Sequence, residues 1–139
     1  MFQHILVPVD YTEKNRNVLA IAINLARAGQ GKISVLHVIE EVHATPVEEF
    51  QTFYAPLEEQ AAQRMEKLVA PYCREAVKID QKITYGNRVQ EIIRFAREEG
   101  IDLIIMNSHK VDWQDPAQGV GTISYTVSIM ADCPVLLIK

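Results

Sequence analysis

The chain of 139 residues has few cysteines, no long apolar run and no excess of basic residues. Its two cysteines, Cys73 and Cys133, stand far apart and form no CxxC or metal-binding pattern, which favours a reduced, cytoplasmic setting. Every apolar stretch has strand length, so we expect no membrane-spanning helix, and no basic, cleavable leader precedes the first apolar run. The net charge of -4 argues against nucleic acid or an anionic membrane as a partner, because both attract basic surfaces.

The patterns of common catalytic and metal sites are also missing. No Gly-x-Ser-x-Gly element is present to carry a nucleophile, and no pair of carboxylates can be assigned to one site. His4, His37, His43 and His109 lack the spacing of metal ligands, and His37 is expected to pack within a strand. We therefore expect no catalytic residue, no metal site and no enzymatic activity.

Five apolar runs alternate with segments of helical spacing. The runs predict strands at 5–9, 33–38, 77–84, 101–106 and 134–138, with 77–84 at an edge of the sheet because its apolar and polar residues alternate. Helices are predicted from a cap at Thr12 to Gly29, over 50–72, from Arg88 to just before Gly100, and over 122–131. Pro56 predicts a kink or a break in the second of these helices.

Alternating strands and helices predict one α/β domain over residues 1–139, with a parallel sheet covered by helices on both faces. In such sheets, ligands bind beyond the carboxyl ends of the strands, where the strand order reverses. The loops that meet there begin at Asp10, Val38, Gly86 and Asn107. Periodicity alone does not distinguish the strand order 3-2-1-4-5 from 2-1-3-4-5.

The last third of the chain carries the most specific pattern. A strand ending at Met106 runs into Asn107-Ser108-His109-Lys110, and a polar loop leads to Gly121-Thr122 at the start of a helix. This arrangement suits a phosphate group, because free backbone N–H groups and the helix dipole both favour an anion. The segment resembles the Gly-x2-Gly-x9-Gly-(Ser/Thr) element of the universal stress protein family. It departs from that element at Asn107 and Lys110, which replace glycines, and by one extra residue before Gly121.

The resemblance extends over the whole chain. The segments that carry it are Ile5–Asp10, Leu36-His37-Val38, Gly86 with the helix that follows, Glu99–Met106 and Cys133–Leu136. By their order and spacing, the chain is identified as a member of the universal stress protein family. The resemblance implies a single open, Rossmann-like sheet of five parallel strands in the order 3-2-1-4-5.

If the chain resembles the nucleotide-binding members, the implied cofactor is ATP or AMP with Mg²⁺; otherwise no cofactor is expected. The resemblance implies that Asp10 contacts the adenosine, that the Val38 backbone faces the adenine, and that Gly121 and Thr122 donate to the phosphates. The implied site residues are Pro8, Val9, Asp10, Thr12, Val38, Met106, Asn107, His109, Lys110, Gly121, Thr122 and Ile123. Asp10 is equally well explained as a turn or cap residue, and His109 is better explained as a solvated loop residue.

The departures from the element predict weakened nucleotide binding. Glycine lets a backbone approach phosphate closely or adopt positive φ at little cost, and Asn107 and Lys110 do so less readily. The Lys110 ammonium would attract phosphate, whereas Asp112 and Asp115 would repel it without a divalent cation. The pattern therefore predicts that Asn107→Gly with Lys110→Gly tightens ATP binding.

Two functions fit the sequence. The first is a non-catalytic stress-response module with weak or absent adenine-nucleotide binding. It would act through a homodimer, formed by the strand Pro134 to Ile138, and through an unknown protein partner at the loop of Trp113. The alternative is a genuine ATP/AMP-binding stress sensor that uses the loop after the fourth strand. A phosphorylatable receiver domain fits poorly, because only Asp10 follows the first strand and Thr84-Tyr85 ends the third.

Overall fold

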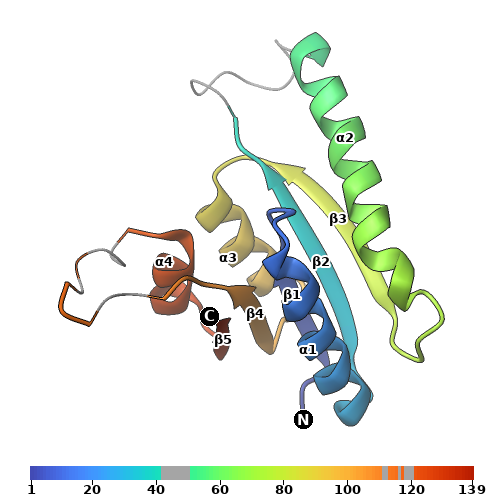
Figure 1. The fold of residues 1–139 in the computed structure, drawn as a ribbon, viewed down its shortest axis with the longest axis vertical. Coiled ribbons are helices and arrows are strands. Elements are labelled where there is room, and N and C mark those ends of the chain that lie inside the picture. Colours follow the sequence, from blue (N-terminus) through green and yellow to red (C-terminus); the bar gives the residue numbers. More distant parts are fainter. Residues whose placement is uncertain (42–50, 111–112, 116, 118–120) are drawn as a thin grey trace.

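A computed structural model gives the structure of residues 1–41, 51–110, 113–115, 117 and 121–139 (Figure 1). The elements in chain order are β1 (His4–Pro8), α1 (Lys14–Gly29), β2 (Lys32–Ile39), α2 (Gln51–Val69), the 3-10 helix η2 (Ala70–Tyr72), β3 (Ile79–Tyr85), α3 (Arg88–Glu98), β4 (Leu103–Asn107), α4 (Ile123–Met130) and β5 (Val135–Ile138). Predictions for the loop after β2, for Phe50 and for Asp112 lie outside the described residues.

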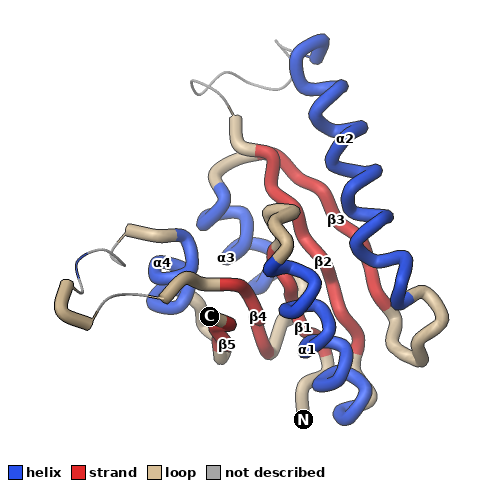
Figure 2. Tube along the Cα trace, in the orientation of Figure 1, coloured by secondary structure: helices blue, strands red, loops and turns tan. Residues whose placement is uncertain are grey.

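The strands form one parallel sheet in the order β3-β2-β1-β4-β5 (Figure 2). The predicted strand order is therefore confirmed, with β3 at one edge and β5 at the other. The strand order reverses between β1 and β4. From β1 the chain continues to β2 on one side, and from β4 it continues to β5 on the other. In Figure 1, α2 lies along the β2 and β3 side of the molecule, and α4 lies on the β5 side.

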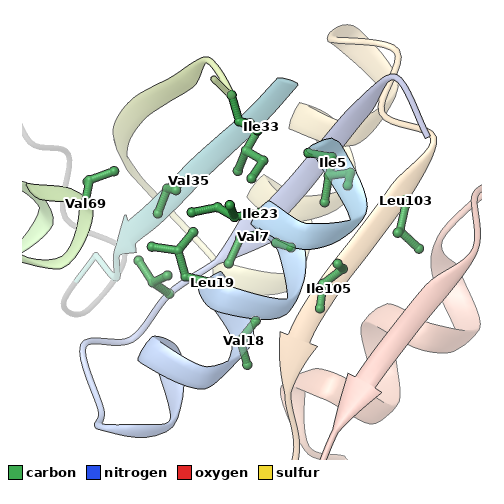
Figure 3. Packing of buried hydrophobic residues seen from close by; sticks show 14 of the residues in the cluster. Ile5, Val7, Val18, Leu19, Ile23, Ile33, Val35, Val69, Leu103 and Ile105 are labelled. Atoms are coloured by element: carbon green, nitrogen blue, oxygen red, sulfur yellow. The ribbon is translucent and has the colours of Figure 1, made fainter. Parts of the chain in front are cut away.

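The sheet separates two apolar cores, one on each face. Side chains of β1 alternate between them, with Ile5 and Val7 in the first core and Leu6 in the second. The first core receives Leu19 and its neighbours from α1, together with Met65 and Val69 from α2 (Figure 3). The second core receives the buried residues of α3 and Val127 of α4. Because β1 is buried on both faces along its whole length, it is the centre of the fold.

Pro56 lies inside α2, which continues without a break from Gln51 to Val69. The predicted break is therefore wrong. Packing against the sheet stabilises the helix. Tyr54 and Ala61 are buried in one apolar cluster with Ile39 of β2. Packing of this face offsets the backbone hydrogen bond that a proline in a helix removes.

The start of α1 also differs from the prediction that Thr12 caps it. The helix begins at Lys14 with Glu13 as its N-cap, and no side chain accepts a hydrogen bond there. Thr12 instead donates both its backbone N–H (3.1 Å) and its hydroxyl (2.8 Å) to Oδ1 of Asp10. These two bonds turn the Thr12 hydroxyl toward Asp10 in a tight turn, and no backbone N–H of α1 donates to it. The turn passes through Tyr11, which has a φ of 65°.

The predicted starts of the last two helices are confirmed. Asn87 caps α3 by accepting a hydrogen bond from the backbone N–H of Gln90, and Thr122 caps α4 by accepting one from Tyr125. Gly86 has a φ of 137°, which favours glycine at this turn. Of the helices in the described part of the chain, none is long and apolar enough to cross a membrane.

Candidate functional site

A cavity of about 210 Å³ lies beyond the carboxyl ends of β1, β2 and β4. Its apolar wall comes from the second core, with Leu36 and Val38 of β2, Ile92 of α3, Met106 of β4 and Ile123 of α4. Its polar rim comes from the loops after β1 and β4 and from the first turns of α1, α3 and α4. The sheet therefore opens at the point where the strand order reverses, as expected for an open α/β sheet.

The structure brings most of the predicted site residues together at this cavity. Those that line it are Pro8, Val9, Asp10, Val38, Met106, Asn107, His109, Thr122 and Ile123. Thr12, Lys110 and Gly121 do not line it. Thr12 is turned toward Asp10, Lys110 is exposed, and Gly121 is exposed with a φ of 87° just before the cap residue of α4.

Asn107 has a structural role that the sequence pattern did not indicate. Its Oδ1 accepts a hydrogen bond (2.9 Å) from Nδ2 of Asn15, a fully buried residue of α1. Oδ1 of Asn15 in turn accepts a hydrogen bond (3.1 Å) from the backbone N–H of Asp10. Asn15 thus connects the loop after β1 with the end of β4. These bonds fix the two sides of the cavity relative to each other.

The conformational reason for glycine at positions 107 and 110 does not apply in this structure. Within the described part of the chain, the non-glycine residues with positive φ are Tyr11 and Gln30. Asn107 and Lys110 therefore adopt ordinary backbone conformations. The predicted gain from Asn107→Gly and Lys110→Gly consequently loses its conformational part, and Asn107→Gly also removes the hydrogen bond from Asn15.

The backbone of Val9 is held from two directions at the rim. Its N–H donates to the carbonyl of Leu36 (2.9 Å), and its carbonyl accepts a hydrogen bond from Nδ1 of His37 (2.9 Å). The His37 ring packs against the Tyr11 ring with a centroid distance of 4.3 Å, which confirms the prediction of a packed histidine. Burial lowers the pKa of His37 below its usual value of 6.5. The neutral ring is therefore favoured and serves as a donor to Val9.

The start of α4 closes the cavity opposite α1. Ser108 and Ser124 are both buried, and their hydroxyl oxygens lie 3.2 Å apart. The backbone N–H of Ser108 donates to the carbonyl of Ile138 (2.7 Å), which attaches the loop after β4 to the last strand. Each serine hydroxyl is hydrogen-bonded to the other, an arrangement that holds α4 against the loop.

Sequence reasoning missed several lining residues. These are Lys14, Leu36, Arg88, Ile92, Ser108 and Ser124. Nζ of Lys14 donates to the carbonyl of Ser108 (3.5 Å), while Arg88 pairs with Glu40 (3.5 Å). The sequence did contain a signal for Lys14. A positive charge in the first turn of a helix is unfavourable for the helix dipole, which indicates a functional position. Across the described residues, no group of three or more His, Cys, Asp or Glu side chains is placed to hold a metal ion.

Comparison with known proteins supports the family that the sequence resembles. The model of the universal stress protein family matches residues 1–139. The chain is similar to universal stress protein YxiE of Bacillus subtilis, with 25% identity over 149 residues that cover all of both chains. The solved structure of MJ0577 of Methanocaldococcus jannaschii is similar at a TM-score of 0.83 and 30% identity, covering 100% of this chain and 96% of that one.

A third relative was solved with a ligand. The universal stress protein from Archaeoglobus fulgidus in complex with dAMP has a TM-score of 0.73 and 20% identity, over 99% of this chain and 98% of that one. At that identity the similarity concerns the fold. Together, the match of the family model over the full length, the strand order and the cavity at the switch point show that this chain belongs to the universal stress protein family.

Proposed function

We propose that this universal stress protein is a non-catalytic module whose cavity binds adenine nucleotide weakly. The observation that carries the proposal is the cavity beyond the carboxyl ends of β1, β2 and β4, which combines an apolar wall with a polar rim. A planar purine suits the wall formed by Val38, Ile92, Met106 and their neighbours, and the rim provides groups for ribose and phosphate. The dAMP bound by the relative with the same fold supports this ligand class.

The size and composition of the cavity favour weak binding. Its volume of about 210 Å³ lies below the roughly 300–1,000 Å³ that is usual for small-molecule sites. Neither Asn107 nor Lys110 provides the close backbone approach that glycine allows. Asp10 is the one carboxylate among the lining residues that the structure describes, so a Mg²⁺ ion would depend chiefly on the nucleotide's own oxygens.

The side chains of the cavity also favour binding without catalysis. A nucleophilic serine needs an adjacent general base. Ser108 and Ser124 instead have each other as hydrogen-bond partner. A general acid and base pair would need two titratable groups with opposed pKa shifts. Asp10 is the one carboxylate in the described lining, so the paired carboxylates of a general acid and base are missing there, which supports a binding role.

Calorimetric titration with adenosine, AMP and ATP, with and without Mg²⁺, tests the proposal. We expect saturable binding of AMP with a Kd in the micromolar to millimolar range, where roughly 4–8 kcal/mol of binding free energy is available. We expect no hydrolysis of ATP over the same period. Turnover of ATP, or the absence of any adenosine or AMP binding, would contradict the proposal. Nucleotide carried through purification, detected at 260 nm, would favour the tight-binding sensor instead.

We further propose that the protein forms a symmetric homodimer through β5. This strand ends the sheet, and a partly apolar edge strand invites pairing with another strand. Leu136 is exposed there, and Tyr125, Ile129 and Met130 are exposed on α4, the helix next to β5. A second copy paired with β5 would cover its open edge. Trp113, which is 83% exposed, remains a candidate contact for a separate protein partner.

Light scattering at micromolar concentration tests the dimer. We expect twice the mass of the 15.8 kDa chain. Leu136→Lys should shift the equilibrium toward monomer, because charge on an edge strand opposes pairing. Gln81→Lys, which places the same charge on the opposite edge strand, is the matched control and should leave the mass unchanged. A strict monomer in the unaltered protein would contradict the proposal.

A further inference from the structure

Lys14 brings a positive charge to the cavity from outside the loop that the family pattern emphasises. It stands at the first position of α1, and its Nζ lies 3.5 Å from the carbonyl oxygen of Ser108. That carbonyl belongs to the loop after β4, where the glycine-rich element would contact phosphate. An ammonium group has three donors, so the bond to Ser108 leaves two of them for a ligand.

The position of Lys14 is unfavourable for the helix itself. The first turn of a helix carries partial positive charge and favours acidic residues, yet the first turn of α1 contains none. Among the ion pairs of the described residues, none includes Lys14. An unpaired charge that opposes the local helix dipole is a feature typical of a functional position.

The other two cations near the cavity are less suited to a phosphate group. Arg88 lines the cavity at the start of α3, but its guanidinium is paired with Glu40. Lys110 follows the loop after β4, but it is exposed and does not line the cavity. Lys14 therefore differs from both, because it lines the cavity and forms none of the ion pairs found among the described residues.

We propose that Lys14 binds the phosphate group of the adenine nucleotide and makes the site prefer a phosphorylated nucleoside over the free nucleoside. In this arrangement, an ammonium from α1 provides the attraction that the missing glycines at positions 107 and 110 would otherwise provide through backbone N–H groups. The inference rests on the proposed adenine-nucleotide function and names the residue that sets its ligand preference.

Titrations of AMP and adenosine against four variants, Lys14→Gln, Lys14→Arg, Lys82→Gln and Lys110→Gln, test the inference. In Lys14→Gln, we expect AMP affinity to fall about tenfold or more, as for loss of a charge-assisted hydrogen bond, and adenosine affinity to stay within about twofold. Lys14→Arg should retain most of the AMP preference, because it keeps the charge. Lys82→Gln on the far edge strand is the matched control, since it removes an equal charge from an exposed site.

A measurement on the unaltered protein makes the test independent of any folding defect in a variant. Raising the salt from about 50 to 500 mM should reduce the preference for AMP over adenosine, because salt screens the ammonium. Equal affinity for AMP and adenosine, or an unchanged AMP affinity in Lys14→Gln, would overturn the role of Lys14 and leave the nucleotide function standing. A loss in Lys110→Gln in place of Lys14→Gln would also overturn it. Failure of both ligands to bind would overturn the two proposals together.

Discussion

Replacing Asn107 by alanine should lower the unfolding free energy by about 1–3 kcal/mol, because it leaves a buried donor without its acceptor. Nδ2 of Asn15 donates to Oδ1 of Asn107, and Asn15 is fully buried. Asn107→Gly should cost about 0.5–1 kcal/mol more than alanine, because glycine adds backbone entropy to the unfolded chain.

Urea denaturation followed by circular dichroism measures these changes. Asn24→Ala is the matched control, because Asn24 is an exposed asparagine of α1, and we expect a change within about 0.5 kcal/mol. Asn15→Ala removes two hydrogen bonds, one from Asp10 and one to Asn107. Because both single variants break the same bond between Asn15 and Asn107, their costs should not add, and we expect a coupling of about 0.5–3 kcal/mol.

Two results would refute this reasoning. If Asn107→Ala were as stable as the unaltered protein, the bond to Asn15 would contribute nothing to the fold. If the costs of Asn15→Ala and Asn107→Ala simply added, the two residues would act independently. The same variants should also loosen the cavity rim, so nucleotide affinity should fall or stay level in Asn107→Gly, contrary to the gain that the sequence pattern predicts.

Three further predictions follow from single features of the fold. Burial lowers the pKa of His4 and of His37 below 6.5, so the unfolded chain binds more protons and the unfolding free energy should fall as the pH drops below 6.5. His4→Gln should flatten that pH dependence, and an unchanged slope would exclude His4 as its source. Pro56→Ala should raise the unfolding free energy by about 1–3 kcal/mol, measured with urea, because it restores a hydrogen bond inside α2. Burial raises the pKa of Cys133, so a thiol reagent should modify the exposed Cys73 first, and equal rates would contradict this.

The strand order and most of the cavity were predictable because they depend on patterns that a sequence displays directly. Apolar runs and caps such as Asn87 and Thr122 give the elements, and the resemblance gives their order. The loops after β1 and β4 then meet by geometry, which places Asp10 and Asn107 at one cavity.

The misses concern contacts between residues far apart in sequence. The bond between Asn15 and Asn107 joins side chains 92 positions apart, so a pattern that treats Asn107 as a replaced glycine cannot detect it. The position of Lys14 at the cavity was not predicted for a similar reason, because its hydrogen-bond partner Ser108 lies far away in the sequence. Thr12 is not a cap because its hydroxyl is turned toward Asp10, two residues earlier, and accepts no hydrogen bond from α1.

The complete burial of β1 has a consequence for how this protein can change over evolutionary time. Ile5, Leu6 and Val7 anchor the two cores, whereas the cavity begins only at the end of the strand, at Pro8 and Val9. The opening is produced by the reversal of strand order, which no single rim residue determines. Exposed rim residues such as Lys14, unlike the hydrogen-bonded pair Asn15 and Asn107, can therefore be exchanged with little loss of stability. A lineage can in this way lose one ligand and acquire another on an unchanged scaffold.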